Sequence, residues 1–182
     1  MNEFELKILD FIAEHFKCGF LDFFMPLVTK LGDGGIFWII VALVLICTKK
    51  YRKTGIMVGV ALLIGLLIGN LTLKPLIARV RPYDMPNVDI KLLVEKLSDK
   101  SFPSGHTLAS FEAATVLMIR DKKLGIPALV LAFIIAFSRL YLYVHYPTDV
   151  LAGAVLGVLF GVLACFIVNK VNDLYNLRKL RQ

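Results

Sequence analysis

The sequence predicts an all-α fold, a polytopic membrane bundle of about six transmembrane helices in one domain over residues 1–182. Of the 182 residues, 58% are hydrophobic. The apolar residues form long runs, and a run of about 20 is what a helix needs to cross a hydrocarbon core of about 30 Å. The only sizeable polar stretch between runs covers residues 82–104, so no linker separates two domains.

Residues 1–17 are expected to form an amphipathic helix. Phe4, Ile8 and Phe11 recur at helical spacing, and acidic residues occupy the other faces. Such a helix would lie at the membrane interface, and the same pattern also fits the first turns of the first span. No cleavable signal peptide is expected, because no basic region leads into an unbroken apolar core with a small-residue cleavage site.

The membrane spans follow in order along the chain. A weak span is expected at residues 19–31, and stronger apolar runs cover residues 35–48, 54–73, 105–119, 124–144 and 150–168. The run at 105–119 carries His106 and Glu112, which indicates a span facing the protein interior because ionisable side chains are costly in lipid. Glycines four residues apart, as at Gly153 and Gly157, favour close packing inside the bundle over a dimer interface. The oligomeric state stays open.

Pro82, Pro86 and Pro103 break helices within the polar stretch at 82–104. Between these prolines, apolar residues at 92–97 predict a short amphipathic helix. We expect this helix to rest on the membrane surface over a pocket.

The charges sort by loop. The chain has 21 Lys and Arg against 14 Asp and Glu, a formal net charge of +7. Basic clusters lie in residues 49–53, 120–123 and 170–182. Alternating spans put all three on one side of the cell membrane, which the positive-inside rule assigns to the cytoplasm together with both termini. Residues 74–104 and 144–149 would then lie on the external face. Because the cations are divided among membrane loops, the net charge does not indicate nucleic-acid binding.

Neither a metal nor a cofactor is indicated by the residue pattern. The three cysteines, Cys18, Cys47 and Cys165, are odd in number and match no metal or redox spacing, so free thiols are expected. Asp, Glu, His and Cys residues likewise form no cluster with metal-ligand spacing.

Three short clusters gather ionisable residues in this apolar chain, and the first is Lys74-x6-Arg81-Pro82. Lys74 and Arg81 are seven residues apart, which is about two turns and 10 Å of rise if one helix carries both. Both cations would then project from one face onto one anion, although Pro75 can kink that helix and Pro82 ends it. The alternative is that both side chains extend to the lipid head groups, as is common at span ends.

The second cluster, Pro103-Ser104-Gly105-His106, precedes the apolar run at 105–119. Ser104 is a natural N-cap, and Gly105 permits close backbone approach. Free N–H groups at a helix start, together with the helix dipole, form a phosphate site. His106 would face the same anion, where acid–base work is favoured over a structural role.

The third cluster, Ser138-Arg139-x5-His145-x3-Asp149, brackets the end of a predicted span. His145 and Asp149 are four apart, so they are neighbours on a helix, and a turn at Pro147 would serve equally well. A carboxylate that accepts one imidazole N–H fixes the tautomer and aims the other nitrogen, as a nucleophilic histidine requires. Asp149 also fits a helix N-cap for the following span, and the two roles are compatible.

Together the clusters resemble the signature of the type 2 phosphatidic acid phosphatase superfamily at every signature position, within a motif-bearing core of about residues 20–169. The resemblance implies a metal-independent phosphatase built as a helical bundle. By that resemblance, the phosphoryl oxygens would be held by Lys74, Arg81, Arg139, Ser104 and the backbone N–H of Gly105. The physical chemistry agrees, since three cations and helix-end amides can supply the charge that magnesium supplies elsewhere.

The catalytic roles also follow from the resemblance. His145 would attack phosphorus and form a phosphohistidine, and Asp149 would orient it. His106 would protonate the leaving oxygen, and water would then release phosphate.

The expected substrate is a lipid phosphate whose tail enters from the bilayer. Resemblance to small bacterial members favours undecaprenyl diphosphate. Phosphatidylglycerophosphate or phosphatidic acid is the alternative and lipid A a weaker third, because the clusters address only the phosphate that all of them share. A lipid-phosphate transporter or scaffold with a vestigial site is the non-enzymatic alternative. His106, His145 and Asp149 disfavour it, because binding alone requires only the cations.

Overall fold

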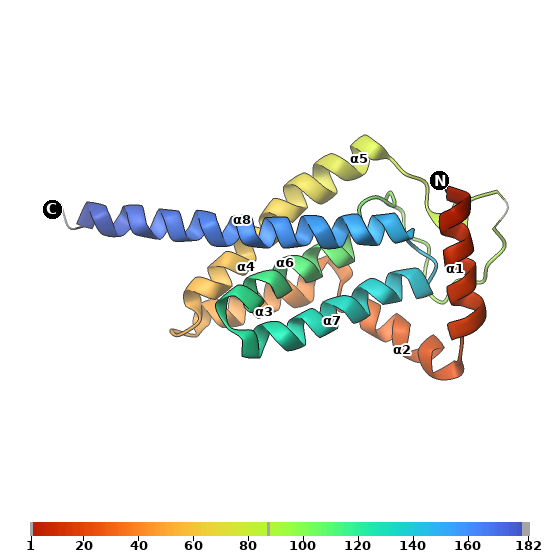
Figure 1. The fold of residues 1–182 in the computed structure, drawn as a ribbon, viewed down its shortest axis with the longest axis horizontal. Coiled ribbons are helices and arrows are strands. Elements are labelled where there is room, and N and C mark those ends of the chain that lie inside the picture. Colours follow the sequence, from red (N-terminus) through yellow and green to blue (C-terminus); the bar gives the residue numbers. More distant parts are fainter. Residues whose placement is uncertain (1, 87, 180–182) are drawn as a thin grey trace.

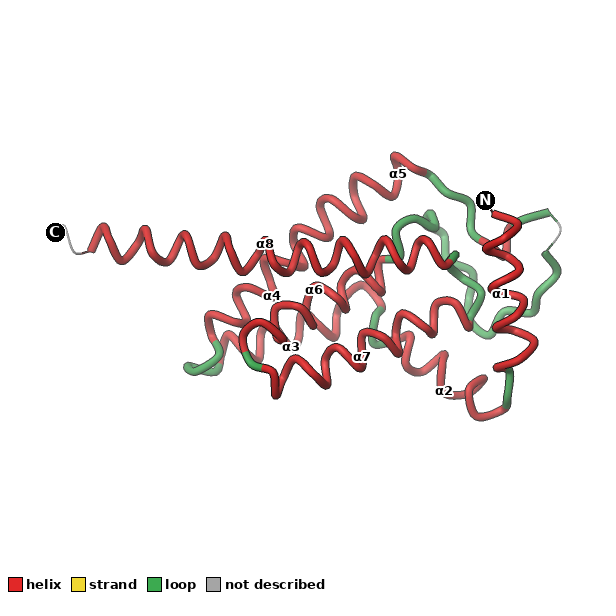
Figure 2. The backbone as a smooth tube through the Cα atoms, viewed as in Figure 1, coloured by secondary structure: helices red, strands yellow, loops and turns green. Residues whose placement is uncertain are grey.

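The computed structural model describes residues 2–86 and 88–179, and every regular element in these ranges is a helix (Figure 2). In chain order the elements are α1 (Asn2–Phe16), α2 (Gly19–Lys30), η1 (Asp33–Gly35), α3 (Ile36–Cys47), α4 (Arg52–Ile64), η2 (Gly65–Leu73), α5 (Lys74–Ile77), η3 (Pro82–Asp84), α6 (Gly105–Arg120), α7 (Lys122–Tyr141) and α8 (Pro147–Lys179). η1 and η3 are single 3₁₀ turns, and η2 is a π-helical stretch that continues α4. The predicted all-α fold class is confirmed.

Helix α6 is the centre of the bundle and packs against α4, α7 and α8 (Figure 1). Its contact with α8 is close because glycines of α8 face it. A Cβ atom added to Gly157 would lie 2.7 Å from the Cβ atom of Phe111, and one added to Gly153 would lie 2.8 Å from the carbonyl oxygen of Ser104. The glycine stripe therefore packs the bundle internally, as expected, and it fixes the start of α6 against the start of α8.

Among the described residues, three helical paths are long and apolar enough to cross a membrane: Arg52–Asp84, Lys122–Tyr141 and Pro147–Leu177. α2 and the η1–α3 segment qualify together as a fourth path, bent by 43°. The break lies between Lys30 and Asp33, and it is followed by Gly34 and Gly35, whose positive φ angles of 56° and 68° suit glycine. Six spans are therefore not confirmed, and the weak span expected at 19–31 shares one bent path with α3.

The bundle has two chemically different ends (Figure 1). The α3–α4 turn, the α6–α7 turn and the C-terminal part of α8 gather at the basic end, which we define by the clusters at 49–53, 120–123 and Lys170. The Tyr51 hydroxyl donates to the Asp121 carboxylate across 3.0 Å and joins the two turns. The opposite end, the motif end, holds α1, loop 85–104 and the starts of α6 and α8. All three sequence clusters meet there.

The N-terminal helix also lies at the motif end, which corrects the expectation that both termini share the basic side. Glu5 of α1 accepts hydrogen bonds from the backbone N–H and the hydroxyl of Thr148, at 3.1 and 2.6 Å. The cause is the bent path of α2 and α3, which carries the chain once from the motif end to the basic end (Figure 1). α1 is helical as predicted, but of the residues at helical spacing Ile12 is buried whereas Phe4 and Phe11 are exposed.

The helix predicted at 92–97 is absent from the described loop, so that prediction is wrong. The Tyr83 hydroxyl donates to the carbonyl oxygen of Leu97 at 3.1 Å and accepts its N–H at 3.0 Å. One side chain thus occupies backbone groups that a helix would pair internally. Leu92 and Val94 are partly buried against the cluster of Tyr83 and Tyr141, so the loop packs on protein instead of resting on lipid.

Candidate active site

The cations of the first cluster do not share a helix, contrary to the expectation from their spacing. α5 ends at Ile77, Ala78 adopts a left-handed conformation with φ 48°, and Arg81 is extended. The physical reason is Pro82, which disfavours helical geometry at the preceding residue. The side chains nevertheless converge, because Lys74 Nζ and Arg81 Nη2 both bind the carboxylate of Asp99, at 2.5 and 2.6 Å.

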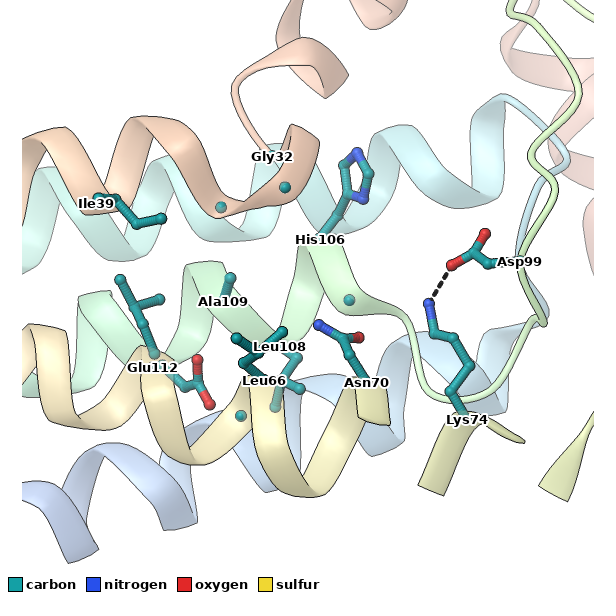
Figure 3. Close-up of a pocket in the computed structure, with 15 residues that line it drawn as sticks. Gly32, Ile39, Leu66, Asn70, Lys74, Asp99, His106, Leu108, Ala109 and Glu112 are labelled. Carbon is teal, nitrogen blue, oxygen red and sulfur yellow. Dashed lines mark hydrogen bonds and ion pairs between the residues drawn. The ribbon is translucent and has the colours of Figure 1, made fainter. Parts of the chain in front are cut away.

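The Asp99 carboxylate therefore occupies the place between two cations that an anionic ligand would take. Figure 3 shows its contact with Lys74 at the mouth of a cavity. Partial burial opposes ionisation, but the hydrogen bonds and charges of Lys74 and Arg81 prevail and lower the pKa of Asp99 from 3.8 to about 2. Asp99 belongs to none of the three clusters. Its contact with Lys74 and Arg81 could not be predicted, because in the sequence it is one of several acidic residues in a polar loop.

Arg139, in the last turn of α7, is the third cation and is only 2% exposed. Its Nη1 group donates to the hydroxyl of Thr29, whereas its Nε and Nη2 groups have no hydrogen-bond acceptor among the described residues. Leaving buried N–H groups unpaired costs about 1–3 kcal/mol each, and more for charged groups. A buried guanidinium with two unused donor groups is the arrangement expected of a site that awaits an anion.

The second cluster is built as predicted. Ser104 has extended backbone angles and caps α6, where its hydroxyl accepts the N–H of Thr107 at 3.5 Å. Its own N–H donates to the carbonyl oxygen of Asp149 at 3.1 Å, which ties the second cluster to the third. A Cβ atom at Gly105 would lie 3.0 Å from the side-chain oxygen of Asn70, so the close approach that glycine permits is used here.

His106, in the first turn of α6, is held by the bend between α2 and α3. Its Nε2 atom lies 2.8 Å from the Asp33 carboxylate. A Cβ atom at Gly32 would come within 2.5 Å of the imidazole ring, so the bend fits closely over it. Asp33 is not among the predicted site residues, and its position among glycines at 32–35 was the available signal for a tight turn.

The third cluster places an aligned histidine beside its carboxylate. His145 is 1% exposed, and its Nδ1 atom lies 3.5 Å from Oδ2 of Asp149. On the opposite side of the ring, Arg81 Nη1 donates to Nε2 across 3.3 Å. An acceptor at Nδ1 and a donor at Nε2 favour the tautomer with its proton on Nδ1, which leaves the Nε2 lone pair directed at the cations.

Burial acts most strongly on His145 and, with the charges of Arg139 and Arg81, lowers the pKa of the imidazole to about 3, against the opposing hydrogen bond of Asp149. The ring is therefore neutral at physiological pH. A neutral imidazole with an unprotonated Nε2 atom is the form that a nucleophile needs.

Asp149 is not the N-cap that the sequence offered, because α8 already begins at Pro147. As the third residue of the helix, it accepts the backbone N–H of Tyr146 at 3.0 Å, as the carboxylate of a capping box does. The same oxygen accepts the Ser101 hydroxyl at 2.5 Å, and the other oxygen binds Arg79 Nη1 at 2.6 Å. Ser101 and Arg79 were missed, although a cation inside the spacer of the first cluster was a usable signal.

A cavity of about 400 Å³ extends from these groups along α6 (Figure 3). Its polar mouth is lined by Lys74, Asp99 and His106. Further along α6 it is lined mainly by apolar residues such as Leu66 and Leu108, together with the carboxyl group of Glu112. Within the chain that the structure describes, no group of three or more His, Cys, Asp or Glu side chains is placed to hold a metal ion. A phosphate head group at the mouth and an apolar tail along α6 would match this gradient of polarity.

Comparison with known proteins agrees with this chemistry. The sequence model of the PAP2 superfamily matches residues 54–173. The chain is 36% identical over 134 residues to an undecaprenyl-diphosphatase of Sulfolobus acidocaldarius, which covers 73% of this chain and 64% of that protein. It is 29% identical over 143 residues to the undecaprenyl-diphosphatase BcrC of Bacillus subtilis, covering 79% of this chain and 72% of that protein.

Solved structures of similar fold are also known. The chain superposes on LpxE of Aquifex aeolicus with a TM-score of 0.77 and 28% identity, covering 87% of this chain and 93% of that one. A PAP2-type phosphatidylglycerolphosphate phosphatase of Bacillus subtilis gives a TM-score of 0.70 at 26% identity, covering 94% and 85%.

Proposed function

The chain belongs to the PAP2 superfamily, and from this premise we propose that it is a membrane-embedded phosphatase that hydrolyses undecaprenyl diphosphate. The observation that carries the proposal is the meeting of two features at the motif end. One is Arg139, a buried cation with unused N–H donors, and the other is His145, a neutral imidazole whose Nε2 atom faces Arg81 across 3.3 Å. An anion-binding residue beside an aligned nucleophile is the requirement for phosphoryl transfer.

Binding begins when the terminal phosphate replaces the carboxylate of Asp99. Lys74 and Arg81 exchange one anion for another, while Arg139 gains the acceptors it lacks. The N–H groups at the start of α6, after the Ser104 cap, face the same phosphate and add the positive end of the helix dipole. The gain in binding free energy is concentrated on Arg139, because its Nε and Nη2 groups obtain acceptors that they lack without the ligand.

The reaction then proceeds in two steps. Nε2 of His145 attacks phosphorus, the bond to the leaving oxygen breaks, and His106 donates a proton to that oxygen. The imidazole becomes positively charged, and Asp149 stabilises this charge through the Nδ1 hydrogen bond. Water then attacks the phosphohistidine, His106 takes the proton of that water, and inorganic phosphate leaves. Lys74, Arg81 and Arg139 stabilise the charge on the phosphoryl oxygens throughout and supply the role that a metal ion has in other phosphatases.

The substrate assignment rests on the named relatives and on the shape of the site. Two relatives are named undecaprenyl-diphosphatases, whereas a solved neighbour is a phosphatidylglycerolphosphate phosphatase. Phosphatidylglycerophosphate and phosphatidic acid are therefore the alternative substrates. The apolar groove beyond the mouth suits a hydrocarbon tail of either kind. By the positive-inside rule the motif end faces outward, and the basic end faces the cytoplasm.

The test is phosphate release from undecaprenyl diphosphate in detergent with excess EDTA. Wild type is expected to release phosphate, and His145→Ala is expected to lose at least about 10⁴-fold in rate, as removal of a nucleophile does elsewhere. The matched control is His15→Ala, since His15 is an exposed histidine of α1 far along the chain from the clusters. Its rate should equal that of wild type.

Two outcomes would change the proposal. Release from phosphatidylglycerophosphate but not from the polyprenyl substrate would replace the substrate and keep the mechanism. No release from any lipid phosphate, with saturable binding of the same lipids, would favour the transporter or scaffold.

A further inference from the structure

Arg79 lies between two buried carboxylates, although it belongs to no predicted site. Its Nη1 group donates to Oδ1 of Asp149 at 2.6 Å and to the Thr148 hydroxyl at 2.7 Å, and its Nη2 group binds the carboxylate of Glu5. The guanidinium carbon lies 3.8 Å from the centre of the Tyr146 ring. These contacts hold the guanidinium on one face and at both terminal nitrogens.

The two oxygens of Asp149 have separate partners. Oδ2 faces Nδ1 of His145 and also accepts the Ser101 hydroxyl and the N–H of Tyr146. Oδ1 is held by Arg79. The main-chain oxygen of Arg79 further accepts the N–H of Ser101 at 2.9 Å. Arg79 therefore restrains Asp149 in two ways. Its guanidinium binds Oδ1 directly, and its main-chain oxygen holds Ser101, whose hydroxyl binds Oδ2.

Glu5 restrains Arg79 in turn. The Glu5 carboxylate is 3% exposed, and its second oxygen accepts two hydrogen bonds from Thr148, the residue next to Asp149. A carboxylate of α1 thus reaches the first turn of α8 by two routes, one direct and one through Arg79. Burial of a charged group without such partners is costly, so this pairing fixes where α1 sits.

We propose that Arg79 and Glu5 are positioning residues of the catalytic centre, and that α1 orients the histidine–carboxylate pair through them. The inference rests on the proposed phosphatase function. Arg79 sets the orientation of Asp149, and Asp149 sets the orientation and tautomer of His145. Neither Arg79 nor Glu5 touches the phosphate, so both act on the rate of chemistry and leave binding by the cations intact.

The charges explain why the chain uses a pair and not an arginine alone. One cation against Asp149 would neutralise the negative charge that the His145 imidazolium needs during the reaction. Glu5 adds a second negative charge on the far side of Arg79, so the three groups together retain a net charge of −1 for the imidazole. Loss of Glu5 should therefore slow the reaction even where Asp149 keeps its place.

The experiment compares Arg79→Gln, Arg79→Lys and Glu5→Gln in the full chain with the lipid substrate that wild type hydrolyses. For Arg79→Gln, kcat is expected to fall about 10-fold to 100-fold, the range seen when a hydrogen-bonded neighbour of a reacting group is removed. Arg79→Lys should recover part of the rate, and Glu5→Gln should fall less than Arg79→Gln. KM and the inhibition constant of inorganic phosphate should change less than about threefold, because the cations stay in place.

The matched controls are Glu3→Gln on the exposed face of α1 and Arg120→Gln at the basic end, both expected to leave kcat unchanged. The double variant of Glu5 and Arg79 should be slower than Arg79→Gln by less than the effect of Glu5→Gln alone, because Glu5 acts partly through Arg79 and partly through Thr148. Unchanged kcat in both single variants would overturn the proposal. So would a rise in KM or in the phosphate inhibition constant at constant kcat, which would make Arg79 a binding residue.

A second readout does not depend on activity. ¹⁵N-histidine spectra, assigned with His145→Ala, report which imidazole nitrogen carries the proton. Wild type should show His145 with its proton on Nδ1, and Arg79→Gln should show a mixture of tautomers. An unchanged tautomer in Arg79→Gln refutes the positioning role, even for a protein that hydrolyses no tested lipid. Absence of hydrolysis by wild type, with the tautomer change present, would refute only the proposed function.

Discussion

The active site has two halves that differ in how completely their polar groups are paired. In the nucleophile half, both oxygens of Asp149 are bound and both nitrogens of His145 face a partner. In the anion half, Arg139 has two donor groups without an acceptor in the described chain. Lys74 there faces Asp99, a carboxylate that is about half exposed.

In the proposed mechanism, this difference separates the groups that react from the groups that bind. A nucleophile must stand in its reactive geometry before the substrate arrives, because any reorientation adds to the barrier. Binding groups gain most when they begin unpaired or weakly paired, since the ligand then supplies a partner that was missing. The candidate site thus combines a fully paired half with an unpaired one, in contact at Arg81.

Among the substitutions that test the two halves, Asp149→Asn in the nucleophile half is expected to have the largest effect on the rate. Loss of the charge and of the acceptor at Nδ1 leaves the ring free to adopt the wrong tautomer, so the rate should fall by up to about 10⁴-fold with detectable residual activity. The free energy of unfolding should also fall, because Arg79 loses its anion. Phosphate-release rates and thermal unfolding in detergent measure both, and an unchanged rate would exclude the orienting role.

Arg139→Met tests whether the unpaired cation of the anion half binds the substrate. The substitution keeps most of the side-chain volume and removes a buried cation, so the thermal unfolding midpoint should rise or stay constant. The value of kcat/KM should fall about 10²-fold to 10³-fold, as when one donor to a developing anion is removed. A variant that loses stability and keeps its rate would mean that Arg139 is structural and not part of an anion site.

The smallest effect is expected from Asp99→Asn. Without the competing carboxylate, the inhibition constant of inorganic phosphate should fall about twofold to fivefold, the size expected of a half-exposed ion pair. The lowered pKa of about 2 means that the ion pair is complete above about pH 4 and is lost only as the pH falls toward 2. The ratio of variant to wild type should therefore stay constant between pH 5 and 9. If the ratio of the two inhibition constants changes within that interval, a group other than Asp99 titrates near Lys74 and Arg81.

Much of the site could be predicted from the sequence because its information is local. The Ser104 cap on Thr107 and the His145–Asp149 pair each depend on residues within four positions of each other. The eight predicted site residues meet at the motif end, in agreement with the prediction that residues 74–104 and 144–149 lie on one face of the membrane. Their chemical roles stay predictions that the variants above would test.

The remainder depends on contacts between distant parts of the chain. Glu5 meets Thr148 across a separation of 143 residues, and Asp33 meets His106 across 73. Such partners have no signature, because Glu5 resembles any acidic residue of an amphipathic helix. The predicted geometry of Lys74 and Arg81 was wrong for a different reason. The prediction assumed one regular helix through a segment that Ala78 and Pro82 interrupt.

The contact of Glu5 with the first turn of α8 also bears on how the protein is made. Glu5 leaves the ribosome long before Thr148, so α1 can make this contact only after residues up to Thr148 have been synthesised. A shorter nascent chain can carry the cations of the first cluster but lacks the His145–Asp149 pair. Under the proposed mechanism, such a chain would therefore be unable to hydrolyse a lipid phosphate.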